Sequence, residues 1–141
     1  MALSRQVPAP AGYSGTPLVA KLGMKPGAKL QLVSAPASLP RLLGPLPTGT
    51  RNVSRGPLDF AMVFVKKKAE LEKQFAKLRD RLEPNGMLWV SWPKKSSGVA
   101  TDLTEDVIRR IGLAAGLVDV KVCAVDETWS GLKFVRRLKD R

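Results

Sequence analysis

The sequence predicts an α/β fold with an open, mostly parallel sheet, helices on both faces and an antiparallel hairpin at the C-terminal edge. Two apolar runs of strand length, Phe60–Val65 and Met87–Val90, lie on either side of a helical pattern. Apolar residues recur in that pattern at helical spacing, at Leu71, Phe75, Leu78 and Leu82. A run without polar alternation is typical of a strand covered on both faces. Together these segments predict a right-handed βαβ unit, with Pro84–Gly86 as the turn before its second strand.

The N-terminal third predicts several short elements. Residues 1–12 are rich in proline and alanine and show no apolar periodicity, which predicts a flexible leader. Thr16 is expected to be the N-cap of a short helix with Pro17 in its first position, and Gly23 is expected to end that helix. The next predicted elements are a strand, a short helix and a weak edge strand, at 28–33, 39–43 and 50–54.

The C-terminal third predicts one helix and a hairpin. Asp102 followed by Glu105 has the spacing of a capping box, so Asp102 is expected to be the N-cap of a helix at 102–115. Alternating valines then predict a strand at 118–125. A polar turn brings the chain back into a second strand at 132–138, which completes the predicted antiparallel hairpin.

The length of 141 residues predicts one α/β domain, which we assign to 13–138, between the leader and a basic tail end at 139–141. No apolar run approaches the ~20 residues of a membrane span, so no membrane partner is expected. Cys123 is the sole cysteine, which excludes an internal disulfide and is typical of a reducing compartment. The sequence therefore predicts a cytoplasmic protein, either monomeric or homodimeric through a free sheet edge near 50–54.

The charge balance and the missing residue types limit the chemistry. The chain has 24 Lys and Arg against 12 Asp and Glu, a formal net charge of +12. This charge favours a polyanionic partner such as nucleic acid, although cations spread along the whole chain are also typical of a solvated surface. Histidine is absent, which excludes a histidine base and a Ser-His-Asp triad, and one cysteine cannot form a zinc site. We therefore assign no catalytic residue and no metal ligand from the sequence.

The loop after the strand at 87–90 is the main candidate binding site. Open α/β sheets bind ligands at the carboxyl ends of their strands, and this loop begins at such an end. It offers ammonium, hydroxyl and indole groups suited to an anion such as phosphate, from Trp92, Lys94, Lys95, Ser96, Ser97 and Thr101. The alternative is an ordinary solvated loop, because lysine, serine and glycine are common in loops.

Trp129, in the predicted hairpin turn or just after it, is a further candidate ligand-binding residue. Its indole ring has the shape of a stacking surface for a base or for a side chain of a partner. The alternative is that the ring packs over the edge of the sheet. Cys123 alternates with Val122 in a predicted strand, so it is interpreted as a small apolar core residue rather than as a reactive thiol.

Four features together resemble the second half of the class I methyltransferase fold. They are Asp59 at the start of a strand, the turn LEPNG, the strand MLWVSWP and the final hairpin, and they cover about 58–137. The resemblance implies a Rossmann-like sheet and makes S-adenosylmethionine the cofactor to test. Cofactor-binding members of that class have a Gly-x-Gly turn after the first strand and an acidic residue after the second. The corresponding segments here are Ser34–Ala37, without glycine, and Arg51–Arg55, without an acid.

Several phrases along 12–137 also resemble a family of small bacterial proteins of unknown function. These phrases are GYSGTPL, LGPLP, GPLD, WPKKSSG, DLTED, GLVDVKV and DETWSGLKFV. This second resemblance implies a bacterial protein and implies no particular activity.

Three hypotheses about function follow. The leading one is a non-catalytic, methyltransferase-like domain that takes no cofactor and binds an anionic small molecule or a macromolecular partner through the region 94–105. The first alternative is an S-adenosylmethionine-dependent methyltransferase with an atypical cofactor loop at 34–38. The second alternative is a nucleic-acid-binding protein that uses its basic faces and the C-terminal residues 136–141.

Overall fold

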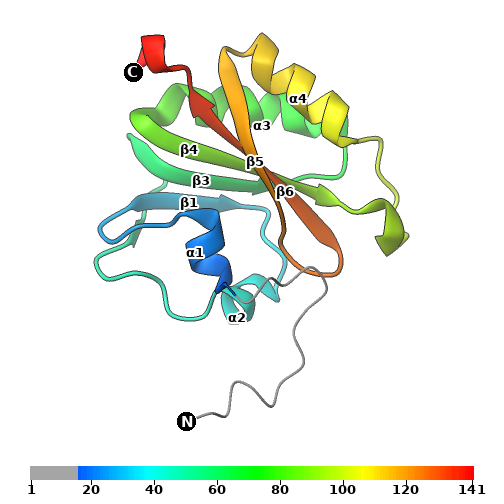
Figure 1. Cartoon of the computed structure of the whole chain (residues 1–141), viewed down its shortest axis with the longest axis horizontal. Coiled ribbons are helices and arrows are strands. Elements are labelled where there is room, and N and C mark those ends of the chain that lie inside the picture. Colours follow the sequence, from blue (N-terminus) through cyan, green and yellow to red (C-terminus); the bar gives the residue numbers. More distant parts are fainter. Residues whose placement is uncertain (1–15) are drawn as a thin grey trace.

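The computed structural model describes residues 16–141, so the predicted leader and residues 13–15 of the predicted domain lie outside the described part of the chain. Six strands form one sheet in the order β2-β1-β3-β4-β6-β5 (Figure 1). The strands are β1 (Lys29–Val33), β2 (Arg51–Asn52), β3 (Leu58–Phe64), β4 (Leu82–Pro93), β5 (Leu117–Ala124) and β6 (Trp129–Arg136). The α-helices are α1 (Leu18–Leu22), α2 (Leu39–Leu43), α3 (Lys68–Arg81) and α4 (Glu105–Ala114).

The pairing of the strands confirms the predicted fold class. Strand β1 pairs in parallel with β2 on one side and with β3 on the other, and β3 pairs in parallel with β4. Strand β6 runs antiparallel to both of its neighbours, β4 and β5. The C-terminal hairpin therefore joins the parallel sheet through its second strand, and its first strand forms one edge of the sheet.

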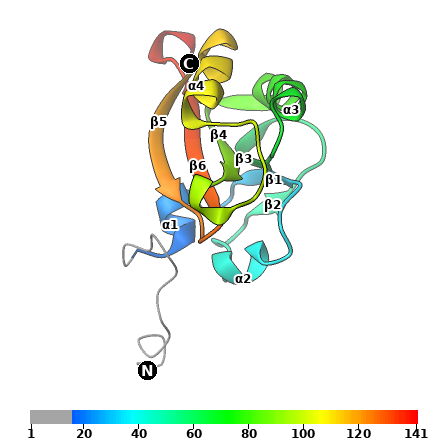
Figure 2. The same ribbon diagram turned by 90° about the vertical axis from the view of Figure 1, so that its right-hand side faces the viewer.

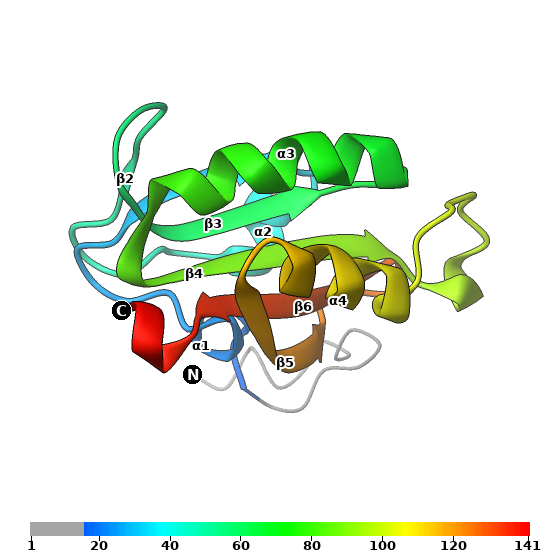
Figure 3. The same cartoon turned by 90° about the horizontal axis from the view of Figure 1, so that it is seen from above.

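Helices cover both faces of the sheet, as the sequence predicts. Helices α3 and α4 lie together over one face, and α1 and α2 lie over the other (Figures 2 and 3). Fully buried side chains under α3 and α4 include Val63, Phe75, Leu88, Ile108 and Phe134. The second core, under α1 and α2, includes Leu22, Leu30, Leu39, Phe60 and Trp89. Each central strand is therefore buried on both sides, which explains its unbroken apolar run.

The segment LEPNG, predicted as a turn, belongs to strand β4 instead. Leu82 pairs with Leu58, and the next pair is Met87 with Phe60, so the residues between Leu82 and Met87 form an irregular bulge. Gly86 brings the bulge close to the neighbouring strand, because a Cβ built there would lie 2.8 Å from the carbonyl oxygen of Leu58. Proline and glycine therefore mark a bulge here rather than the start of a strand.

The predicted capping box of Asp102 and Glu105 is wrong, because Asp102 is not the N-cap of α4. The carboxylate of Asp102 accepts a hydrogen bond from the backbone N–H of Lys68 at 2.8 Å, so it binds the first residue of α3. The N-cap of α4 is Thr104, whose hydroxyl oxygen accepts from the backbone N–H of Val107 at 3.2 Å. Asp102 thus links two helix starts that are far apart in sequence, and helix α4 begins later than predicted.

Other boundaries differ by a few residues. The N-cap of α1 is Pro17 rather than Thr16, because Pro17 has an extended ψ of 144° and the helix begins after it. Gly23 ends α1 in the left-handed conformation, as predicted. The weak edge strand is only Arg51–Asn52. Strand β6 begins at Trp129, so this residue lies just after the turn, which is one of the two positions that the sequence predicts.

Candidate functional site

The strand order creates a crevice at the carboxyl ends of β1 and β3. Strands β2 and β3 lie on opposite sides of β1, so the chain changes direction across the sheet at this point. In open α/β sheets this switch point is where ligands bind. A cavity of about 380 Å³ lies there, within the range of small-molecule sites. It is lined by Ser34, Pro36, Phe64, Lys66, Glu70 and Trp129.

Ser34, the residue that follows β1, has an unusual backbone conformation. Its φ is 57°, which places it in the left-handed region, and it is the sole non-glycine residue with positive φ within 16–141. A residue with a side chain adopts this region at a cost of order 1–3 kcal/mol. The loop therefore makes the turn that glycine makes without strain, and it presents the exposed Ser34 side chain to the cavity.

Two aromatic rings form one wall of the switch-point cavity. Phe64 and Trp129 meet edge to face, with ring centroids 5.1 Å apart and an interplanar angle of 86°. Trp129 is 9% exposed, so most of its indole ring packs against the sheet and only a small part reaches the cavity. The ring therefore packs within the fold, and a stacking role for its exposed part stays a prediction.

Charged groups of both signs lie at the rim of the same cavity. Lys66 follows β3, and Glu70 lies in the first turn of α3. Both residues are exposed, so neither charge carries a burial cost in the absence of a ligand. The backbone carbonyl of Lys66 accepts a 2.6 Å hydrogen bond from the hydroxyl of Thr101, which ties this cavity to the loop after β4.

A second cavity, of about 330 Å³, lies at the carboxyl end of the neighbouring strand β4. It is lined by Trp92, Pro93, Lys95, Thr101, Leu103, Thr104 and Glu105. The structure therefore brings three of the predicted binding residues together, namely Trp92, Lys95 and Thr101. Lys94, Ser96 and Ser97 are not in this lining, and Trp129 lines the other cavity.

The hydroxyl group of Ser97, in the loop after β4, is hydrogen-bonded within the loop itself. The hydroxyl of Ser97 donates to the carbonyl of Lys94 at 2.6 Å and accepts from the N–H of Val99 at 3.1 Å. The backbone N–H of Lys94 donates to the carbonyl of Thr128 at 2.7 Å, which holds the loop against the β5–β6 turn. These bonds give the loop a defined shape and leave Lys95 as its exposed cation at the second cavity.

Several other predicted features have plain structural roles. Cys123 is 8% exposed, and burial raises the pKa of its thiol, so it has the properties of a core residue. Arg136, predicted to belong to the basic C-terminal cluster, is the last residue of β6 and donates to the carbonyls of Arg79 and Leu82, both at 2.8 Å. No helix within 16–141 is long and apolar enough to cross a membrane. The same residues contain no metal-binding group of three or more His, Cys, Asp or Glu side chains.

Comparison with solved structures identifies the fold. An S-adenosylmethionine-dependent methyltransferase from Aquifex aeolicus superposes with a TM-score of 0.58 and 14% identity, over 83% of this chain and 86% of that one. Fibrillarin from Aeropyrum pernix, with natively bound S-adenosylmethionine, gives 0.54 and 13%, over 88% and 70%. Magnesium protoporphyrin IX methyltransferase from Synechocystis, also with the cofactor bound, gives 0.53 and 17%, over 85% and 74%. The chain therefore has the Rossmann-like fold of these methyltransferases.

Comparison of the amino-acid sequence with known families and proteins does not assign the chain to a family. No family model matches the chain, and no curated protein matches it. The resemblance to bacterial proteins of unknown function therefore stays a prediction. The expectation that no cofactor is involved is not supported, because similar structures contain bound S-adenosylmethionine or its product.

Proposed function

We propose that this protein is an S-adenosylmethionine-dependent methyltransferase that binds its cofactor in the switch-point cavity. The observation that carries the proposal is the cavity itself, at the carboxyl ends of β1 and β3, entered by a loop with a left-handed residue at Ser34. Backbone strain of this kind persists where the surrounding structure enforces it, and it is concentrated at ligand sites. This proposal replaces the non-catalytic hypothesis as our first choice.

The residues of the cavity fit the cofactor in part. Phe64 and Trp129, both largely buried, form an apolar wall against which a base can lie, and Lys66 provides a cation for a carboxylate. Glu70 is the carboxylate in this lining, and we assign to it the ribose hydroxyls that an acid after β2 would otherwise bind. When bound, the cofactor supplies an electrophilic methyl group on a sulfonium ion.

Two features set the site apart from a glycine-loop methyltransferase. Pro36 has no backbone N–H, so the loop after β1 offers one donor fewer to a ligand. The segment between β2 and β3, residues 53–57, reads VSRGP and contains no acid. We therefore expect weaker cofactor binding than a glycine loop would provide.

The second cavity is the proposed site of the methyl acceptor. It lies at the end of β4, directly beside β3 in the sheet, and it combines the indole of Trp92 with the ammonium group of Lys95. An exposed cation beside an apolar ring favours an acceptor with an anionic group and a flat or apolar part. The predicted anion site is thus retained as the acceptor side of the proposed reaction.

Cofactor binding is the first prediction, and isothermal titration calorimetry measures it. S-adenosylmethionine and S-adenosylhomocysteine are expected to bind at a single saturable site and to raise the melting temperature. Glu70→Gln is expected to weaken binding about tenfold or more, since it removes a charged hydrogen-bond acceptor. Asp80→Asn, the same change at the other end of α3, is expected to leave the affinity unchanged. Absence of saturable binding by either compound would overturn the proposal.

Anion binding at the second cavity is tested separately, with inorganic pyrophosphate as the probe. Addition of pyrophosphate is expected to shift the indole N–H signal of Trp92 in NMR spectra, because this ring lines the cavity beside Lys95. Lys95→Gln is expected to abolish most of that shift, whereas Lys73→Gln on the outer surface of α3 is expected to preserve it. A shift that survives Lys95→Gln would place the anion elsewhere, whether or not the cofactor binds.

A further inference from the structure

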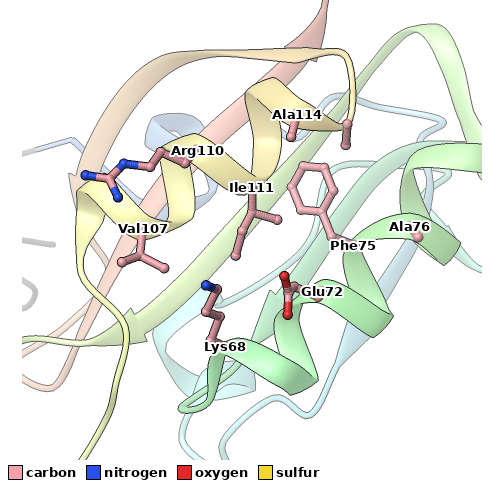
Figure 4. A pocket seen from close by; sticks show the side chains of 9 residues that line it. Lys68, Glu72, Phe75, Ala76, Val107, Arg110, Ile111 and Ala114 are labelled. Atoms are coloured by element: carbon pink, nitrogen blue, oxygen red, sulfur yellow. The ribbon is translucent and has the colours of Figure 1, made fainter.

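A third cavity, of about 360 Å³, lies on the helical face of the molecule, between α3 and α4 (Figure 4). It is separate from the two cavities at the carboxyl edge and shares no lining residue with them. Most of its lining is apolar and comes from Phe75, Ala76, Val107, Ile111, Ala114 and Ala115. Its charged lining residues are Lys68, Glu72 and Arg110.

The apolar part of this groove follows from small side chains on facing helices. Ala76 of α3 and Ala114 of α4 are exposed and leave space between the helices. Phe75 is 1% exposed and forms the base of the groove, where it meets Phe134 edge to face with ring centroids 5.3 Å apart. Helix α3 therefore packs on the sheet through Phe75, whereas the solvent-facing sides of α3 and α4 remain separated by the groove.

The groove has two different ends. Beyond Ala76, the guanidinium of Arg79 donates to the carbonyl of Ala115 at 3.0 Å and links the last turns of the two helices. Lys68, Val107 and Arg110 lie toward the opposite end (Figure 4). The distance along α3 from Lys68 to Ala76 is about 12 Å, at a rise of about 1.5 Å per residue. The groove is therefore an apolar slot with a cationic end and a cross-linked end.

The cations at the open end are available to a ligand. Within 16–141, neither Lys68 nor Arg110 takes part in an ion pair, whereas the adjacent Arg109 bonds three carboxylates, those of Glu105, Asp106 and Asp119. Those bonds, the one to Asp119 above all, raise the pKa of Arg109. The lining thus holds two cations and one carboxylate, that of Glu72, and the guanidinium of Arg110 points away from this carboxylate (Figure 4).

We propose that this groove binds a small amphiphile, an alkyl chain of medium length with an anionic head group. The chain lies over Phe75 and Ile111, where it covers apolar surface, and the head group lies beside the ammonium group of Lys68. A length of about 12 Å matches an extended chain of about ten carbon atoms, because each C–C bond of a zigzag chain advances about 1.25 Å along its axis. A cross-linked slot of this volume is the size of a small-molecule site.

Calorimetry with decanoate as the probe tests the proposal, and decyltrimethylammonium is the matched cationic control. Decanoate is expected to bind at one site with a negative heat-capacity change, and hexanoate to bind more weakly, because less apolar surface is buried. The cationic control is expected to bind at least about fivefold more weakly than decanoate, since Lys68 and Arg110 repel its head group. Equal affinity for both head groups would overturn the proposed charge recognition.

Variants of the groove test its location. Ala114→Leu fills the slot from an exposed helix position, and it is expected to reduce decanoate affinity at least about tenfold. Ala69→Leu, the same change at an exposed position of α3 outside the groove, is the control and is expected to have no effect. Unchanged decanoate binding by Ala114→Leu, with the fold intact by circular dichroism, would overturn the site.

Charge variants test the head-group position. Lys68→Gln is expected to weaken decanoate binding about two- to fivefold, and Glu72→Gln to strengthen it by a similar factor, because the first removes an attraction and the second a repulsion. Sedimentation with phosphatidylglycerol vesicles separates a free amphiphile from a bilayer as its source. Vesicle binding lost with Ala114→Leu would assign the groove to a lipid surface and overturn the proposal of a free ligand.

Discussion

Replacing Gly112 by alanine is expected to destabilise the protein by about 2–3 kcal/mol, although alanine is the better helix former by about 1 kcal/mol. Gly112 lies in α4, where the helix rests on the ring of Phe134. A Cβ built at Gly112 would lie 2.0 Å from Cε1 and 2.6 Å from Cδ1 of that ring. Phe134 is fully buried against Phe75, so its ring has no free space to move into.

Urea unfolding followed by circular dichroism measures this effect. Leu113→Ala, at the next position of the same helix, is the control and is expected to cost about 0.5 kcal/mol or less, since Leu113 is 42% exposed. Adding Phe134→Leu to Gly112→Ala is expected to cost less than the sum of the two single changes, because the smaller side chain relieves the clash. A Gly112→Ala variant as stable as the parent would contradict the packing of α4 on the sheet.

Replacing Trp89 by alanine is expected to cost about 3–5 kcal/mol, which is a large part of the stability of a domain of this size. Trp89 is fully buried at the centre of β4 and faces α1. Its indole N–H donates to the carbonyl of Leu22, the last residue of α1, at 2.8 Å. Its ring packs against Gly131 of β6, where a Cβ would lie 3.1 Å from the ring.

Two conservative variants separate the parts of that effect. Trp89→Phe keeps a ring but leaves the carbonyl of Leu22 without its buried donor, and it is expected to cost about 1–3 kcal/mol. In hydrogen-exchange measurements, the Trp89→Phe variant is expected to exchange its α1 amides faster than the parent protein does, with a smaller change in α3. The reason is that the lost hydrogen bond anchors α1, and not α3, to the sheet. Gly131→Ala is expected to destabilise the protein as well, because the new Cβ would press on the ring of Trp89 from strand β6. If both Trp89→Phe and Gly131→Ala were as stable as the parent, the described packing of Trp89 would be contradicted.

These two positions determine how the helices pack on the two faces of the sheet. Gly112 sets the height of α4 above the sheet, and α4 forms one side of the groove that we assign to an amphiphile. Trp89 fixes α1, which lies on the opposite face. Neither residue lines a cavity at the carboxyl edge, so loss of stability and loss of ligand binding can be measured independently.

The sequence predicts the regular part of this fold because that information is local. Apolar runs and helical spacing identify β3, α3, α4 and the C-terminal hairpin within a few residues, and they identify the second half of β4, since each pattern reflects which face of one element is buried. The order of these elements predicts a mostly parallel sheet, because a right-handed crossover constrains how neighbouring strands connect. Of the binding residues, the loop after β4 is found in the same way, since it follows the end of a central strand.

Only the tertiary structure decides which distant residues meet. Asp102 has the spacing of a local cap, yet it binds the N–H of Lys68, 34 residues earlier in the chain. The switch-point cavity combines Ser34, Phe64 and Trp129 from three separate strands or their ends, and no sequence spacing records that proximity. The groove between α3 and α4 likewise depends on Ala76 and Ala114, which line the same cavity from two neighbouring helices. Local patterns specify each element, whereas the cavities depend on long-range packing between elements, and that packing exists only in the folded chain.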